Sequence, residues 1–282
     1  MGMTAIEERK DVVFSDDCGR ALKLDLYRPA TPNGAAVIIA HGGGWSRGSK
    51  DMVAEHARAL ARQGFVALAQ EYRLTGEAPF PACIHDVKRA IRWTKKEAPG
   101  LGFDPRKLCL EGHSAGAHLA LLAAAAPEDA RLDPPEGMGG AAGEVAAVAA
   151  IYPPVLFHLG GPRPSGALAA RVLPGADASE DAARLASPIE HVRAGFPPVM
   201  LLHGDADKVV PVSASRRFDE KVRAVGGKAE LHIFAGLPHG FGSHPQIRPM
   251  MMDLIGAFFR RWVIAPEVFE QPAAPAREPQ PA

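Results

Sequence analysis

The sequence predicts an α/β fold in which a mostly parallel central sheet is flanked by helices. Short apolar runs, such as residues 35–40, suit strands that are buried on both faces of a parallel sheet. Segments with helical periodicity alternate with these runs, which is typical of βαβ units. Hydrophobic residues make up 47% of the 282 residues, a fraction sufficient for one sizeable core.

The first half of the chain begins with strands and then alternates strand and helix. Residues 12–15 and 22–27 alternate apolar and polar side chains, as half-buried antiparallel strands do. The apolar run at residues 35–40 is the first strand expected inside the parallel sheet. A helix at residues 51–62 and a strand at residues 65–70 follow it.

The second half continues this alternation. A helix is expected at residues 85–96, because Val87, Ile91 and Thr94 lie along one face and its lysines mostly lie on another. The remaining expected strands are residues 107–111, 145–152, 199–203 and 229–234, and the remaining expected helices are residues 114–126, 213–225 and 249–263.

Two stretches fall outside the pattern. Residues 153–188 are rich in Gly, Pro and Ala and connect two expected core strands, so we interpret them as a lid or pocket wall. Residues 265–282 are rich in Pro and Ala, and they are expected to form a disordered tail. A single domain is therefore predicted over residues 1–264.

Charge and composition exclude several classes of partner. The 32 basic and 32 acidic residues balance, which argues against nucleic acid and gives no reason to seek an anionic membrane. The charged N-terminal residues lack the apolar core of a signal peptide, and no apolar run approaches a membrane span. We therefore expect a cytoplasmic protein whose partner is a small molecule. Three widely spaced cysteines do not suggest a disulfide scaffold or a zinc knuckle.

A Gly-His-Ser-Ala-Gly motif at residues 112–116 stands where an expected strand turns directly into a helix. A serine on such a turn needs neighbours without bulky side chains two residues before and after it. The helix that follows directs free N–H groups toward developing negative charge. Ser114 is therefore the candidate nucleophile, although the motif alone is also compatible with an ordinary loop that contains a capping serine.

Three consecutive glycines follow the strand at residues 35–40, in His-Gly-Gly-Gly-Trp at residues 41–45. Such a run frees backbone N–H groups to point into a cleft, where they can stabilise the oxyanion of a tetrahedral intermediate. The alternatives are a flexible loop or a phosphate cradle. The phosphate alternative lacks the Gly-Lys-Ser/Thr ending of a P-loop.

Loops after two later strands carry a candidate carboxylate and a candidate base. Asp205 and Asp207 follow the strand at residues 199–203, and either can orient a catalytic histidine. We expect one of them to be catalytic and the other to hold the loop. His239 follows the strand at residues 229–234, and the carboxyl ends of parallel strands are where catalytic groups gather.

Taken together, these segments resemble the hormone-sensitive-lipase-like bacterial esterases, most closely their acetyl and feruloyl carboxylesterase branch. The resemblance implies the α/β-hydrolase fold, with about eight strands in the sheet and a small lid insertion. The segments that carry it are residues 41–45, Tyr-Arg-Leu at 72–74, Pro-Phe-Pro-Ala at 79–82, residues 112–116, His-Leu-Ala at 118–120 and His-Gly-Phe at 239–241.

The resemblance also implies roles for individual residues. The oxyanion donors would be the backbone N–H groups of Gly43, Gly44 and Ala115. The Gly-x-x-Asp-x-x-Val-Pro stretch at residues 204–211 selects Asp207 over Asp205 as the catalytic carboxylate. Too little chain precedes residue 41 for the helical cap of larger relatives, so we expect an open pocket.

The predicted function is hydrolysis of short-chain acyl esters by a serine carboxylesterase. Ser114 would attack the ester carbonyl, His239 would remove its proton, and Asp207 would orient the histidine. The expected partner is a small-molecule ester, with no cofactor and no metal, and a homodimer is allowed for. An arylformamidase is the alternative, because residues 41–45 and 112–118 also resemble kynurenine formamidases. A non-catalytic ligand-binding protein with the same fold is the third hypothesis.

Overall fold

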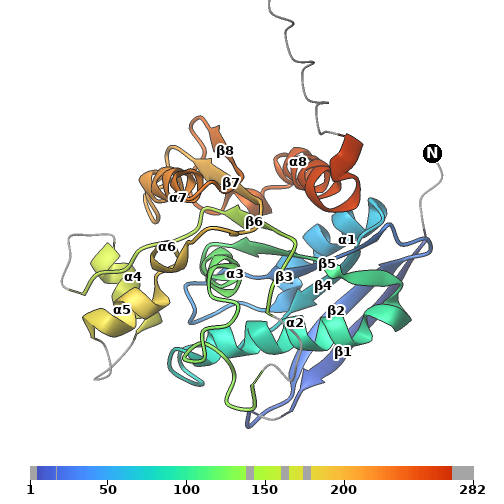
Figure 1. Cartoon of the computed structure of the whole chain (residues 1–282), viewed down its shortest axis with the longest axis horizontal. Helices are drawn as coiled ribbons and strands as arrows, with labels where there is room; N and C mark the ends of the chain where they lie inside the picture. The colour runs from blue at the N-terminus through green and yellow to red at the C-terminus, as the bar shows by residue number, and fades with distance from the viewer. Residues whose placement is uncertain (1–4, 17, 138–142, 160–164, 174–178, 269–282) are drawn as a thin grey trace, which may run out of the picture.

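A sheet of eight strands runs through the computed structural model, which describes residues 5–16, 18–137, 143–159, 165–173 and 179–268. The strand order is β1-β2-β4-β3-β5-β6-β7-β8. β2 pairs antiparallel with β1 and β4, and all other neighbours are parallel (Figure 1). The strands are β1 (Ile6–Ser15), β2 (Leu22–Pro29), β3 (Gly34–Ala40), β4 (Val66–Gln70), β5 (Phe103–His113), β6 (Ala147–Ile151), β7 (Val199–Gly204) and β8 (Ala229–Phe234).

The inner strands are apolar throughout because helices cover both faces of the sheet. In β3, Val37 and Ile39 contribute to one hydrophobic core, whereas Ala36 and Ile38 contribute to the other. Successive side chains of a strand point to opposite faces, so a strand covered on both sides has no polar side. The predicted α/β fold with a mostly parallel sheet is confirmed.

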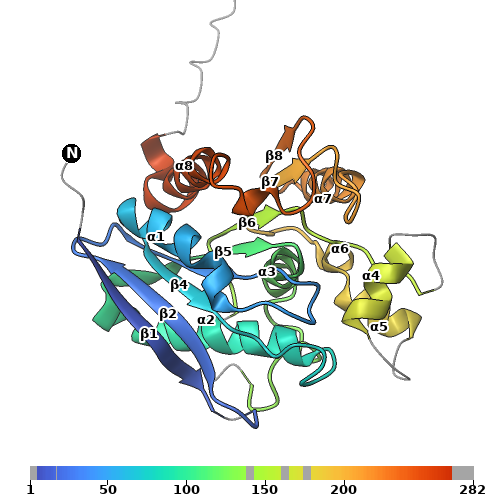
Figure 2. The same ribbon diagram turned by 180° about the vertical axis from the view of Figure 1, so that it is seen from behind.

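Helices cover both faces of the sheet (Figures 1 and 2). On the first face lie α1 (Ala54–Arg62), preceded by the 3-10 turn η1 (Lys50–Val53), and α8 (Arg248–Phe259), extended by the π-helical turn η3 (Arg260–Ile264). On the second face lie α2 (Ala82–Leu101), α3 (Ala115–Ala125) and α7 (Ser213–Ala224). The short turn η2 (Phe241–Ser243) lies between β8 and α8.

Some predicted bounds are wrong, chiefly at the outer strand and at helix ends. β1 begins at Ile6 instead of residue 12, because pairing with β2 extends it through exposed charged residues that carry no apolar signal. The helix expected at residues 85–96 extends to Leu101. Gly102 follows it with a φ of 84°, the left-handed conformation common after a helix.

The segment interpreted as a lid or pocket wall contains two short helices, α4 (Ser165–Val172) and α5 (Glu180–Ala186), and a third, α6 (Pro188–His191), begins at its last residue (Figure 1). Residues 160–164 and 174–178 of this segment lie outside the described residues. The tail expected to be disordered from residue 265 begins with a 3-10 turn, η4 (Pro266–Val268), and residues 269–282 lie outside the described residues.

Within the described ranges, no helix combines the length and the apolar character needed to cross a membrane.

Candidate active site

Ser114 lies in the sharp turn between β5 and α3, with φ 50° and ψ −114°. This strained conformation requires the two flanking glycines. A Cβ on Gly112 would lie 2.3 Å from the carbonyl oxygen of Gly116, and a Cβ on Gly116 would lie 2.2 Å from that of Ala40. The Ser114 N–H donates to the Ile151 carbonyl on the neighbouring strand, 2.9 Å away. The turn is thus held from both sides, as a nucleophile elbow is.

The structure brings Ser114, His239 and Asp207 together at the carboxyl ends of three strands. Ser114 Oγ lies 3.0 Å from His239 Nε2, and His239 Nδ1 lies 2.6 Å from Asp207 Oδ2. The Asp207 carboxylate can only accept, so Nδ1 of His239 carries the proton. His239 Nε2 is then left as the acceptor for the serine hydroxyl, which is the arrangement a general base requires.

Asp207 is held by groups that favour its charged form. Its Oδ1 accepts hydrogen bonds from the Val209 and Val210 N–H groups at 2.8 and 2.9 Å, and His203 Nε2 lies 3.3 Å from Oδ2. Burial opposes ionisation, but the hydrogen bonds from His203, His239 and the backbone outweigh it, so the pKa of Asp207 lies well below its usual range.

Asp205 occupies a different position in the same loop. It is exposed, and its Oδ1 accepts a hydrogen bond from the Gly236 N–H at 2.6 Å. This contact ties the loop after β7 to the turn after β8. Of the two candidate aspartates, only Asp207 is placed against His239.

The glycine run forms the floor of the cavity beside Ser114. Gly43 and Gly44 line this cavity and have φ values of 128° and 61°, which favour glycine. A Cβ on Gly43 would also lie 1.9 Å from the Arg47 carbonyl oxygen. Ala115 begins α3, so its N–H lies in the first turn, where N–H groups have no acceptor within the helix.

The cavity has a volume of about 800 Å³, and the insertion supplies part of its wall through Leu168 and Arg171 of α4. A hydrogen-bonded chain joins the glycine loop to another helix of the insertion, α5. Trp45 Nε1 donates to His118 Nδ1 at 3.0 Å, and His118 Nε2 donates to the Ala186 carbonyl at 2.7 Å. His118 is therefore neutral, and burial lowers its pKa to about 4.

Acid should destabilise the fold through His118. The pKa of His118 in the folded protein lies below its ordinary value of 6.5. As the pH falls below 6.5, His118 therefore becomes protonated in the unfolded chain, whereas in the folded protein it stays neutral down to about pH 4. The free energy of unfolding should fall across this window by up to about 1.4 kcal/mol per pH unit from this group. Urea unfolding at pH 7, 6 and 5 measures the slope. His118→Gln should make this slope shallower by up to about 1.4 kcal/mol per pH unit, the contribution of one proton. An unchanged slope would contradict the conclusion that His118 is neutral in the folded protein.

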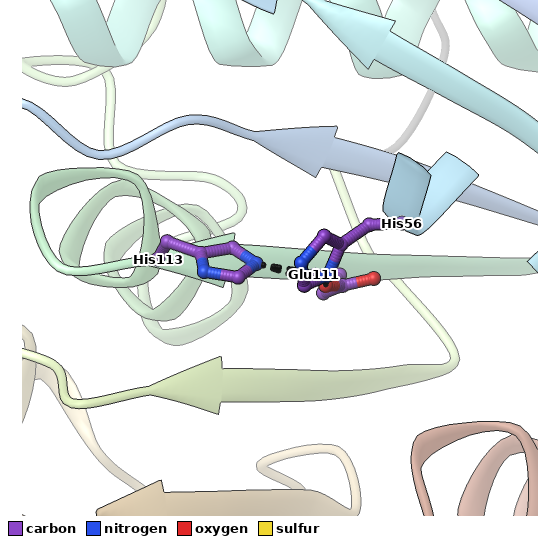
Figure 3. Close-up of side chains that lie close together, drawn as sticks. All are labelled: His56, Glu111 and His113. Carbon is purple, nitrogen blue, oxygen red and sulfur yellow. Dashed lines mark hydrogen bonds and ion pairs between the residues drawn. The ribbon is translucent and has the colours of Figure 1, made fainter. Parts of the chain in front are cut away.

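A second cluster of polar side chains consists of His56, Glu111 and His113, the last of which directly precedes Ser114 (Figure 3). Glu111 and His113 are two residues apart on β5 and so point to the same face, where they meet His56 of α1. Glu111 Oε1 lies 2.9 Å from His56 Nδ1 and 3.1 Å from His113 Nε2. His56 Nε2 lies 3.2 Å from the Gly242 carbonyl oxygen. The cluster thus joins α1, the strand before Ser114 and the loop after His239.

Glu111 draws its two histidine partners into one cluster. Its carboxylate oxygen can only accept, so His56 Nδ1 and His113 Nε2 each donate to it, and these two ring nitrogens lie 3.2 Å apart. Burial opposes ionisation of Glu111, but the charge of His56 and the hydrogen bonds from His113 and His56 lower its pKa to about 2. In the described residues, this is the group of side chains whose atoms lie close enough to hold a metal, within 4.8 Å of one another. Their mutual hydrogen bonds account for the contacts.

Sequence reasoning missed Glu111 and His56. The available signal was a carboxylate in an otherwise apolar strand, because a buried charge needs a partner. That signal does not identify the partner, since His56 lies 55 residues away in the sequence.

Known proteins resemble both the sequence and the structure. The sequence matches the BD-FAE family over residues 24–222. It is 32% identical over 253 residues to the probable carboxylic ester hydrolase LipM of Mycobacterium tuberculosis, which covers 85% of this chain and 55% of LipM. For the esterase LipC of the same organism, identity is 33% over 247 residues, covering 83% of this chain and 60% of LipC. The chain thus spans little more than half the length of these curated relatives.

A solved structure extends the similarity over nearly the whole chain. Esterase 2 of Thermogutta terrifontis superposes with a TM-score of 0.80 and 28% sequence identity. The match covers 94% of this chain and 97% of that one.

Proposed function

The chain belongs to the BD-FAE family and has the α/β-hydrolase fold, and from this premise we propose that it is a serine carboxylesterase. The observation that carries the proposal is the hydrogen-bonded row of Ser114, His239 and Asp207 beside a cavity of about 800 Å³. Relatives named as esterases support it. Esterase 2 of Thermogutta terrifontis is also described as phosphonylated by sarin, a reaction typical of an activated serine.

The proposed reaction is acyl transfer in two steps. Ser114 Oγ attacks the ester carbonyl while His239 Nε2 takes the serine proton and passes it to the departing alcohol. Asp207 holds the imidazole and stabilises its charged form. The N–H groups of Gly43, Gly44 and Ala115 are the proposed donors to the oxyanion. Water then attacks the acyl-enzyme, with His239 again as the base, and releases the acid.

Short acyl chains are the proposed substrates. Each methylene favours the transition state by about 0.8 kcal/mol only if the pocket buries it. The cavity wall combines glycines, polar side chains and two arginines, Arg47 and Arg171, with five apolar side chains: Trp45, Met52, Val53, Leu168 and Val209. Structures of esterase 2 of Thermogutta terrifontis are described with propionate and with butyrate bound.

A series of p-nitrophenyl esters from acetate to palmitate tests both the activity and this preference. We expect kcat/KM to be highest for acyl groups of about two to six carbons and to fall beyond roughly eight, because further methylenes stay in water. A maximum of kcat/KM at twelve carbons or longer would refute the preference for short acyl chains and would leave the esterase activity itself supported. Absence of turnover on every ester would refute the esterase itself.

An arylformamidase remains the second candidate. The contact between Trp45 and His118 joins two residues of the patterns that resemble kynurenine formamidases. The same serine chemistry would cleave a formyl amide, so N-formylkynurenine belongs in the substrate panel beside an acetylated sugar. If kcat/KM is higher on N-formylkynurenine than on every ester, the arylformamidase becomes the first candidate and the carboxylesterase the second. The cytoplasmic location and the homodimer stay predictions.

A further inference from the structure

The cavity beside Ser114 has an uneven charge. Arg47, from the loop after the glycine run, and Arg171 of α4 both line it. None of the lining residues within the described chain is Asp or Glu. The whole chain carries 32 basic and 32 acidic residues, so this excess of positive charge is local. A cleft lined by one sign of charge attracts ligands of the opposite sign.

Neither arginine has a carboxylate partner among the residues that the structure describes. Both are exposed, whereas the largely buried Arg73 and Arg89 both bind Asp86, at 2.8 and 2.7 Å. An unpaired guanidinium keeps all of its N–H donors free for a ligand, and its planar fork matches a carboxylate.

Both arginine side chains lie against the glycines next to the nucleophile. Arg171 Nη1 would lie 3.4 Å from a Cβ on Gly44, and Arg47 Cγ would lie 3.3 Å from a Cβ on Gly43. Arg171 Nη1 thus lies beside Gly44, one of the proposed oxyanion donors, so a carboxylate bound to it is only a few atoms away from a carbonyl carbon attacked by Ser114. That distance is spanned within one small substrate molecule. Arg47 adds its positive charge to the wall of the same cavity.

We propose that the enzyme prefers esters that carry a carboxylate, which Arg171 and Arg47 bind while the scissile carbonyl lies at Ser114. This rests on the proposed esterase function and specifies its substrate class. Ser114 Oγ bonds to the acyl carbon as the bond to the alcohol breaks. The alcohol leaves with the proton taken by His239, and water releases the acid.

Matched esters test the preference. On the alcohol side, 4-acetoxybenzoate is compared with its neutral isostere 4-acetoxybenzamide. On the acyl side, mono-p-nitrophenyl adipate is compared with its methyl ester. We expect kcat/KM to be about tenfold or more higher for the anion in at least one pair, mainly through a lower KM. This ratio should fall as the ionic strength rises, because salt screens exposed charges.

Substitutions locate the source of the preference. Arg171→Gln and Arg47→Gln should each lower the anion-to-neutral ratio, and the double variant should bring it close to one. Arg106→Gln is the matched control, since Arg106 lies at the opposite end of β5 with its side chain 89% exposed. The ratio should be unchanged in this control.

The outcomes separate this proposal from the one it rests on. Equal kcat/KM within both pairs in the wild-type enzyme would overturn the carboxylate preference alone, provided that p-nitrophenyl butyrate is hydrolysed. A fall in kcat by the same factor on neutral and anionic esters in Arg171→Gln would also overturn it, and would assign Arg171 to the oxyanion instead. No turnover of any ester, p-nitrophenyl butyrate included, would refute the esterase and the preference together. If a variant fails to fold, the wild-type enzyme alone still tests the proposal, because the ratio of kcat/KM on the anionic ester to that on the neutral ester must fall as the salt concentration rises.

Discussion

Replacing Ser114 with alanine is expected to lower kcat on p-nitrophenyl butyrate by about 10⁴- to 10⁶-fold, the range typical of nucleophile deletions in serine hydrolases. Alanine retains the Cβ of serine and can adopt the same backbone conformation. The close packing around Gly112 and Gly116 and the hydrogen bond to Ile151 hold the φ of 50° in both proteins. The fold should therefore survive, and far-UV circular dichroism together with the melting temperature checks this.

A fluorophosphonate probe gives an independent readout, with a control inside the chain. Ser215 Oγ lies 2.7 Å from His203 Nδ1, and His203 Nε2 lies 3.3 Å from Asp207, so this row resembles the proposed catalytic one. Ser215 is fully buried, however, and no reagent reaches it. The probe should label Ser114 and should still label the Ser215→Ala variant. Labelling at Ser215, or full activity in Ser114→Ala, would refute the nucleophile assignment.

The most predictable parts of the fold were those where burial leaves a pattern in the sequence. The strand expected at residues 229–234 coincides with β8 (Ala229–Phe234), because apolar and polar side chains alternate along it and glycines lie just beyond both of its ends. The exposed half of β1 has no such pattern, since its charged residues are held by pairing with β2 rather than by burial. The helices of the insertion were not predicted either. They are short, and packing rather than propensity stabilises helices of this length.

The candidate site was predictable to a different degree for each residue. Ser114 and His239 could be located from local signals, because a strained turn needs glycines and a base belongs in a loop beyond a strand. The cluster of His56 and Glu111 could not, since its partners come from a helix and a strand that only the fold brings together. Local reasoning also left Asp205 and Asp207 equivalent, and only the resemblance selected Asp207.

The structure supplies a physical reason to treat the two aspartates differently. Asp207 Oδ1 accepts two backbone N–H groups, from Val209 and Val210, so an amide at this position must keep its oxygen there. Its NH₂ group would then face His239 Nδ1 as a donor. His239 would be forced into the tautomer that carries its proton on Nε2, which cannot accept the proton of Ser114. The Asp205 side chain accepts one backbone N–H, from Gly236, and an amide oxygen can replace that acceptor.

Asp207→Asn is therefore expected to lower kcat on p-nitrophenyl butyrate by about 10⁴-fold, the loss seen when a triad aspartate is changed to its amide. Asp205→Asn is its matched control and should lower kcat by less than about tenfold, because the loop contact survives the change. KM should change little in either variant, since neither side chain lines the cavity. Steady-state kinetics and melting temperatures of both proteins decide the matter. A larger loss in the Asp205 variant, or a loss below tenfold in the Asp207 variant, would show that the carboxylate bound to His239 is not the one that orients it during catalysis.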